Sequence, residues 1–160
     1  LISDQGFPSD WLVGGNRCIT RGLFKAWGEK DGGVVAGRLC GLEAVRLGKG
    51  CGWRCFALNL GQDESNLILH FNPRFDFRGD IRTIVCNSKA DGDWGTELRE
   101  SRFPFQHGEE TKLCVSFDAE EITVELSEGQ ELRFPNRLGL EAVDYFSVTG
   151  DLDVKSIKFK

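Results

Sequence analysis

The stretch LHFNPRF, from Leu69 to Phe75, alternates apolar and hydrogen-bonding residues as a β-strand with one buried face does. Successive side chains of a strand point to opposite faces of the sheet, so two faces are predicted. The face predicted to lie in the core comprises Leu69, Phe71, Pro73 and Phe75. The opposite face comprises Ile68, His70, Asn72 and Arg74. Three different hydrogen-bonding groups in a row on a rigid strand indicate recognition of a small polyhydroxylated ligand.

Similar short apolar runs recur from Phe56 to the C-terminus. Val, Ile, Phe and Leu concentrate in these runs, and Gly, Asp, Asn, Ser or Pro separate them. The predicted strands are Phe56–Leu60, Asn66–Phe75, Arg82–Asn87, Glu97–Glu100, Lys112–Asp118, Glu121–Leu126, Gln130–Phe134, Ala142–Val148 and Leu152–Phe159. No segment shows a helical stripe, so an all-β protein built as a β-sandwich is predicted.

The composition changes near residue 54. Residues 1–54 hold 12 of the 20 Gly and carry 8 Lys and Arg against 5 Asp and Glu, whereas residues 55–160 carry 12 against 20. The first part also lacks sustained periodicity apart from a short apolar run near residues 33–39. It is therefore predicted to be an atypical N-terminal segment, disordered or only partly structured.

Charge and composition argue against several classes of function. The net charge of −5 gives no basic face for nucleic acid. No run of about 18 apolar residues occurs, so no membrane insertion is predicted. The N-terminus LISDQGFPSDWLVGG lacks the features of a secretory signal, so the 6 cysteines are predicted to be free thiols in a reducing compartment. No metal or other cofactor is predicted, because Cys51 and Cys55 lack a second ligand pair.

Further hydrogen-bonding residues follow the predicted strand Asn66–Phe75. Asn87 ends a predicted strand, and the segment WGTELR supplies an aromatic plate in Trp94, an acceptor in Glu97 and a planar donor in Arg99. Glu97 and Arg99 are predicted to share a strand face. A pairing of Glu97 with either Arg74 or Arg99 would hold its carboxylate in place for ligand hydroxyls. The predicted carbohydrate-binding residues are His70, Asn72, Arg74, Asn87, Trp94, Glu97 and Arg99. Such a set suits a galactose, whose axial 4-hydroxyl can meet the polar row while its C–H face packs on the ring.

These motifs resemble the carbohydrate-recognition signature of the galectins. The matching patterns are H-x-N-x-R at 70–74, V-x-N at 85–87 and W-G-x-E-x-R at 94–99. The wider text, including ALNLG at 57–61 and FPNRLGLEA at 134–142, is similar to single-domain prototype galectins. The resemblance covers residues 56–160 and implies a jelly-roll sandwich of two antiparallel sheets that needs neither metal nor catalysis.

The resemblance also implies a role for each residue. His70, Asn72 and Arg74 would bind the galactose 4-hydroxyl, Asn87 and Glu97 would bind its 6-hydroxyl, and Trp94 would stack on the ring. Arg74, Glu97 and Arg99 would also contact the next sugar, a glucose or N-acetylglucosamine. The expected function is that of a lectin for lactose or N-acetyllactosamine-type glycans on glycoconjugates, in the cytoplasm and, by non-classical secretion, outside the cell.

Upstream of Phe56 the sequence departs from the family pattern. Residues 40–55 read CGLEAVRLGKGCGWRC, in which the second N-terminal strand has no visible counterpart. The expected organisation is residues 1–54 as the atypical segment and residues 55–160 as the recognition domain. The family resemblance implies a homodimer through the terminal strands. Formation of such a dimer depends on the atypical N-terminal segment, which would supply one of these strands.

Three other readings remain open. A glycoside hydrolase needs two carboxyl groups flanking the bond, and the sequence places only Glu97 in the predicted site. A galectin-fold module that acts through protein contacts, with impaired or no sugar binding, is the alternative function. The tripeptide Arg78-Gly79-Asp80 spells an integrin-type adhesion motif, but such tripeptides also arise by chance.

Overall fold

The computed structural model describes residues 20–23, 37–47, 54–150 and 152–154 of the chain. These residues form two antiparallel β-sheets, and the described part contains no helix besides the single 3-10 turn η1 (Ser127–Gly129). The larger sheet has the strand order β1-β11-β3-β4-β5-β6, with β7 also paired to β5. The smaller sheet has the order β10-β9-β8-β2-β12. No helix among these residues is long and apolar enough to cross a membrane.

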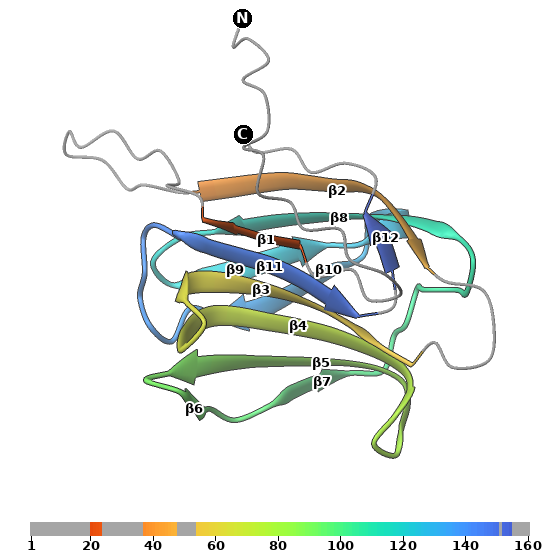
Figure 1. Cartoon of the computed structure of the whole chain (residues 1–160), viewed down its shortest axis with the longest axis horizontal. Coiled ribbons are helices and arrows are strands. Elements are labelled where there is room, and N and C mark those ends of the chain that lie inside the picture. The colour runs from red at the N-terminus through yellow and green to blue at the C-terminus, as the bar shows by residue number, and fades with distance from the viewer. Residues whose placement is uncertain (1–19, 24–36, 48–53, 151, 155–160) are drawn as a thin grey trace, which may run out of the picture.

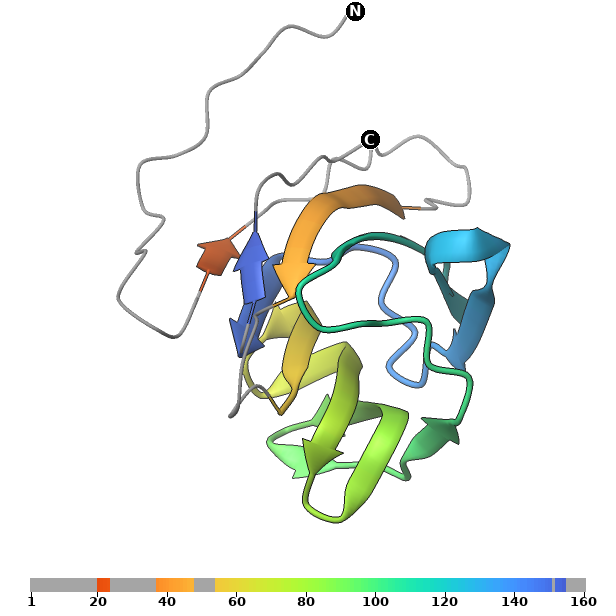
Figure 2. The ribbon, with the colours of Figure 1, turned by 90° about the vertical axis from the view of Figure 1, so that its right-hand side faces the viewer.

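The strands of the two sheets pack as two layers, so the predicted sandwich is confirmed (Figures 1 and 2). The larger sheet contains β1 (Thr20–Leu23), β3 (Phe56–Asp63), β4 (Asn66–Phe77), β5 (Asp80–Ala90), β6 (Asp93–Trp94), β7 (Leu98–Glu100) and β11 (Tyr145–Gly150). The smaller sheet contains β2 (Gly37–Leu47), β8 (Glu110–Phe117), β9 (Glu121–Glu125), β10 (Glu131–Pro135) and β12 (Leu152–Val154).

Phenylalanine rings fill much of the space between the sheets. The largest fully buried side chains are Phe56, Phe71, Phe105, Phe134 and Phe146. Phe105, in the connection from β7 to β8, meets the rings of Phe56 and Phe71 edge-on, at centroid distances of 5.5 and 6.4 Å. Edge-to-face contacts add to the free energy gained by burying the rings. This packing therefore fixes β3 and β4 on the face of the larger sheet that is turned toward the core.

Two tight turns set the register of β5 at both of its ends. Arg78 and Gly79 connect Phe77 to its partner Asp80, and both have positive φ, 51° and 83°. Asp91 and Gly92 connect β5 to β6 in the same way, with φ of 51° and 87°. Two-residue turns of this type match the twist of paired strands. The adhesion-like tripeptide is thus a hairpin turn followed by the first residue of a strand.

The strict alternation predicted for β4 is wrong at its start. Leu67 is opposite Lys89 and His70 is opposite Asn87, so three steps on β4 face two steps on β5. The extra residue is a β-bulge, which breaks the alternation of faces. As a result Ile68, predicted on the polar face, packs in the core together with Leu69. From His70 onward the predicted alternation holds.

The N-terminal region contributes two strands that its composition did not indicate. β1 pairs with β11 at the edge of the larger sheet, and β2 lies between β8 and β12 in the smaller one. Apart from these strands and Arg54, the structure does not describe the residues of the segment 1–54. The division of the chain at residue 54 therefore remains a prediction.

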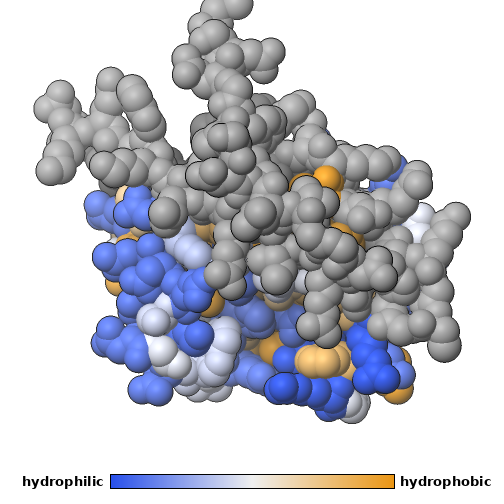
Figure 3. All heavy atoms as spheres, in the orientation of Figure 1, coloured by the Kyte–Doolittle hydropathy of each residue, from blue (hydrophilic) through white to orange (hydrophobic). Residues whose placement is uncertain are grey.

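The surface is mainly hydrophilic where Figure 3 shows it in colour. Among the described residues, the large hydrophobic side chains that lie exposed are Ile81 and Trp94. A single exposed apolar side chain is ordinary, but an exposed tryptophan beside polar residues marks a candidate binding surface.

Candidate functional site

The polar residues of β4 lie on the outer face of the larger sheet. Asn72 and Arg74 are 5% and 8% exposed, so they are far more buried than a solvated strand face would be. The amide of Asn72 donates from Nδ2 to the Phe56 carbonyl at 2.6 Å and accepts at Oδ1 from Arg74 Nε at 2.9 Å. Val85, the register partner of Asn72 on β5, is 1% exposed and is not part of the core cluster. The row is therefore held in place before any ligand arrives.

Trp94 lies beside this row and faces solvent. Its side chain is 51% exposed, and its ring centroid is 4.9 Å from that of His70, with the planes tilted by 59°. The Lys89 ammonium, on the neighbouring strand, is 4.8 Å from the indole centroid. The exposed aromatic plate expected at this position is present, adjacent to the first residue of the row.

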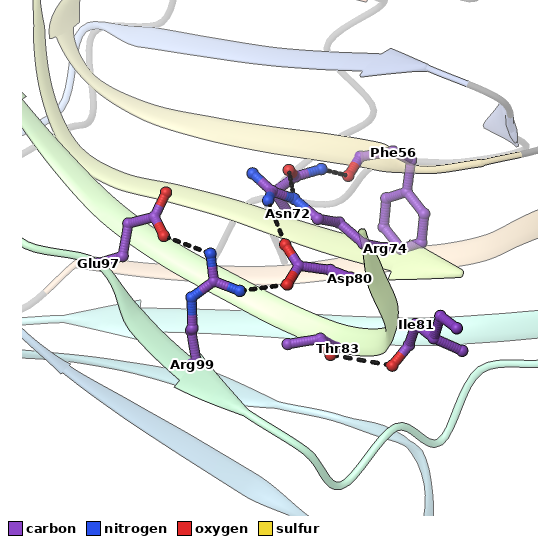
Figure 4. A network of polar contacts seen from close by, with 8 residues as sticks. All are labelled: Phe56, Asn72, Arg74, Asp80, Ile81, Thr83, Glu97 and Arg99. Carbon is purple, nitrogen blue, oxygen red and sulfur yellow. Dashed lines mark hydrogen bonds and ion pairs between the residues drawn. The ribbon is translucent and has the colours of Figure 1, made fainter. Parts of the chain in front are cut away.

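A chain of ion pairs crosses the site from β4 to the β7 side (Figure 4). Arg74 donates to Asp80 at 2.6 Å, Arg99 donates to the other oxygen of Asp80, and Arg99 donates to Glu97 at 2.7 Å. Of the two arginines considered as partners of Glu97, Arg99 is the one that pairs with it, while Arg74 pairs with Asp80. The placement of Glu97 and Arg99 on one strand is wrong, because β7 begins at Leu98 and Glu97 lies in the preceding loop.

Asp80 was not predicted, although it links the two arginines. Glu97 is the single acid that the sequence pattern predicts in the site, and the structure brings a second one there. Hydrogen bonds from Arg74, followed by those from Arg99, hold the pKa of Asp80 below its ordinary value. The carboxylate is therefore charged at neutral pH. The two-residue turn at Arg78-Gly79 was the available signal, because a tight hairpin returns Asp80 next to the strand that carries Arg74.

His70 is the residue whose protonation the site changes most. Burial is the main cause that lowers its pKa from 6.5 to about 4, and the charges of Arg74 and Lys89 add to it against the opposing effect of Glu97. The imidazole is therefore neutral at physiological pH. Its Nδ1 lies 2.6 Å from Asn59 Oδ1, while Nε2 has no hydrogen-bond partner among the described residues.

Asn87 and the loop that follows Trp94 are held by an arginine from a distant part of the chain. Asn87 donates from Nδ2 to the Gly95 carbonyl at 2.9 Å. Arg137, in the turn after β10, donates to the Thr96 carbonyl at 2.9 Å and to Ser88 Oγ at 3.1 Å, and lies 3.4 Å from Asn87 Oδ1. Sequence reasoning missed Arg137, since 50 residues separate it from Asn87.

The structure thus brings the seven predicted residues into one cluster. The cluster offers donors on the arginines and amides, acceptors on Glu97 and His70, and a flat apolar ring. Hydroxyl groups both donate and accept, so this mixture suits a sugar. No group of three or more potential metal ligands occurs among the described residues.

Comparisons with known proteins agree with this geometry. A family model described as galactoside-binding lectin matches residues 50–159. The chain belongs to the galactoside-binding lectins, the galectins. Galectin-1 of Mus musculus is 52% identical over 107 residues, which are 67% of this chain and 79% of the relative. The 16 kDa beta-galactoside-binding lectin of Gallus gallus is 56% identical over 104 residues, 65% of this chain and 77% of the relative.

Solved galectin structures share the fold. CG-16, described as a homodimeric agglutinin from chicken liver, superimposes with a TM-score of 0.76 at 41% identity, covering 89% of this chain and 99% of that one. The complex of toad ovary galectin with N-acetylgalactose gives a TM-score of 0.69 at 39% identity, covering 78% of this chain and 88% of that one. These likenesses establish the family and the two-sheet galectin fold.

Proposed function

We propose that this galectin binds terminal β-galactosides of the lactose and N-acetyllactosamine type on glycoconjugates, without changing them chemically. The observation that carries the proposal is the exposed Trp94 ring 4.9 Å from His70, beside the ion-paired chain of Arg74, Asp80, Arg99 and Glu97. A pyranose laid on the indole would present its hydroxyls to that polar row.

In this proposal each predicted residue has at least one task. His70, Asn72 and Arg74 bind the axial 4-hydroxyl, while Asn87 and Glu97 bind the 6-hydroxyl. Arg74, Glu97 and Arg99 extend to the second sugar. A glucoside, whose 4-hydroxyl is equatorial, would leave the buried row partly unpaired, and unpaired buried polar groups cost about 1–3 kcal/mol each. This penalty is the source of the preference for galactose.

The two carboxylates of the site support binding rather than glycoside hydrolysis. Hydrolysis requires one carboxylic acid that can give up a proton at neutral pH. Asp80 instead has a lowered pKa, because two arginines donate to it, and Glu97 is paired with Arg99. A chromogenic β-galactoside should therefore bind and release no product.

Binding of a single disaccharide is expected to be modest. About 23 heavy atoms at about 0.3 kcal/mol each give about 7 kcal/mol, or a Kd near 10 μM. Multivalent engagement would then raise the strength of attachment to clustered glycans. A homodimer through the terminal strands would supply it, and β1 and β12 do form edges of the two sheets. A cytoplasmic and extracellular distribution, the latter by non-classical secretion, completes the proposal.

Retention on lactose-agarose with elution by free lactose tests the binding function. The wild-type chain should be retained, and Trp94→Ala and Arg74→Ala should each flow through while their far-UV circular dichroism stays unchanged. Soluble, folded wild-type protein that flows through would favour a module acting through protein contacts. Retention of both variants would show that the sugar is bound elsewhere.

A further inference from the structure

Arg82 has a left-handed backbone in the middle of a β-strand. Its φ is 46°, although it lies within β5, where φ of about −140° is regular for an antiparallel strand. Arg78 and Asp91, which also have positive φ, lie in two-residue turns. A residue with a side chain keeps this conformation only where its surroundings hold it, and such residues concentrate at functional sites. Arg82 is two residues from Asp80, the carboxylate that links the arginines of the site.

Side-chain contacts hold Arg82 in this conformation. Arg82 is exposed to solvent, yet its guanidinium is directed at the protein. Nη2 donates to the Phe103 carbonyl at 3.0 Å, Nη1 lies 3.5 Å from the Phe105 carbonyl, and the guanidinium carbon is 5.0 Å from the Phe103 ring centroid. Both phenylalanines belong to the core cluster. The side chain therefore fixes the backbone of β5 to the connection between β7 and β8.

The alternation of faces is inverted at the end of the β4–β5 hairpin. Thr83 is directly opposite Arg74, and Asp80 is directly opposite Phe77. Three residues separate the two pairs along each strand, so regular alternation would turn the pairs to opposite faces. Yet the Phe77 ring lies 5.5 Å from the Arg74 guanidinium, and Asp80 accepts from that guanidinium at 2.6 Å (Figure 4). Asp80 is therefore turned to the face that carries Arg74.

Each strand of the hairpin has one irregularity at the level where this inversion occurs. On β4, the N–H groups of Phe75 and Asp76 both donate to the Arg54 carbonyl, at 2.8 and 3.4 Å. Two successive N–H groups on one carbonyl are the pattern of a β-bulge. On β5 the irregular residue is Arg82. The strands are still paired beyond this level, where Asp76 is opposite Ile81, so both strands change face together.

We propose that Arg82 is a positioning residue, whose left-handed backbone turns Asp80 toward the two arginines of the site. The contacts with the Phe103 carbonyl and ring hold that backbone conformation. Ligand affinity then depends on a residue that does not contact the ligand. That the ligand is a galactoside rests on the proposed function. The orientation of Asp80 does not, because it is a property of the unliganded protein.

Two substitutions separate the backbone conformation from the guanidinium. Both Arg82→Asn and Arg82→Val remove the guanidinium, but asparagine tolerates positive φ, whereas a β-branched valine opposes it. Arg82→Asn is therefore expected to lose at most about threefold in lactose affinity. Arg82→Val should lose at least about tenfold, because Asp80 would no longer reach both guanidinium groups. Titration calorimetry measures both losses. Arg102→Val removes a 70% exposed arginine nearby and should bind as the wild type does.

A double-mutant cycle shows whether the loss passes through Asp80. In the Asp80→Asn background, Arg82→Val should weaken lactose binding no further. A second readout is the pKa of Asp80, which the arginines hold below its ordinary value. Carbon nuclear magnetic resonance of the carboxyl group should show this pKa raised in Arg82→Val and still lowered in Arg82→Asn. A general loss of stability would not distinguish the two variants in this way.

The outcomes separate the positioning role from the sugar function. Equal affinities and an equal pKa of Asp80 in Arg82→Asn and Arg82→Val would overturn the positioning role, and so would additive losses in the cycle. Arg82→Ala, which also disfavours positive φ, replaces Arg82→Val if the valine variant does not fold. A wild type that fails to bind lactose, while the pKa of Asp80 responds to the variants as expected, would refute the sugar function and leave the positioning role standing.

Discussion

Asp80 carries a charge on which two arginines of the site depend. Its oxygens accept from Arg74 and Arg99, and its side chain is 18% exposed. Without this charge the two guanidinium groups would repel each other and lose their common anchor. Both oxygens of Asp80 are directed at the arginines, so we expect its effect to appear in affinity more than in folding.

Asp80→Asn is expected to weaken lactose binding at least tenfold, about 1.4 kcal/mol, because it removes the negative charge between the guanidinium groups. Titration calorimetry measures the change. Asp76→Asn, an exposed substitution on β4, is the matched control and should bind as the wild type does. Equal affinities of the two variants would remove Asp80 from the site.

His70 should make the stability of the fold depend on pH. Its pKa is about 4 in the folded protein, against 6.5 for an unperturbed imidazole, chiefly because it is buried. Between these values the unfolded chain binds the proton and the folded chain does not. The contribution of His70 to stability is therefore fully present above about pH 6.5. As the pH drops toward 4, the free energy of unfolding falls by on the order of 3 kcal/mol.

Urea denaturation between pH 4 and 7 measures this loss. His70→Gln cannot titrate and should show a shallower decline over the same interval. Parallel declines of the wild type and the variant would mean that other groups, such as the carboxylates, account for the pH dependence.

At the scale of elements, the loop from β6 to β7 is a part of the site that lies outside the strands. Residues 95–97 lie outside the strands, yet they join Trp94 to Arg99. The Arg137 guanidinium contacts the Thr96 carbonyl and also lies over the Phe134 ring, 4.7 Å from its centroid. This arginine therefore links the loop of residues 95–97 to the turn that follows β10.

Arg137→Gln is expected to loosen residues 94–97 and to reduce lactose affinity several-fold, because Trp94 and Glu97 would lose their fixed separation. Hydrogen exchange should rise in the loop and not in β4. Arg133→Gln is the control, since Arg133 is a 64% exposed surface residue paired with Glu121 and Glu131. Exchange that rises equally in both variants would argue against a specific tether.

The positions of the strands along the chain could be predicted from sequence better than their contacts. Alternation located β3, β4, β5 and β8 to β10 within a few residues, because each has one apolar face. It could not locate the bulge before His70, which depends on pairing with β5. It also missed β6, whose two residues carry no period, although the turn before it was visible as ADGD.

At the scale of the whole molecule, the site lies on one face of a sheet whose other face supports the core. Motif spacing was enough to predict His70, Asn72, Arg74, Asn87, Trp94, Glu97 and Arg99, since resemblance to a family preserves spacing. Asp80 and Arg137 have no comparable motif. Asp80 meets Arg74, 6 residues away, across a tight hairpin that the sequence signals, whereas Arg137 contacts Asn87 across 50 residues, which only the folded chain reveals.

The paired turns that bound β5 have a consequence for how this protein could diverge. A strand clamped by two-residue hairpins at both ends cannot slide, and a shift of one residue would turn its side chains to the opposite face. A slip of β5 by one residue against β4 would thus send Asn87 into the apolar interior even if the sandwich still formed. Evolution can exchange residue types in this recognition surface far more easily than it can alter the length of the chain beneath it.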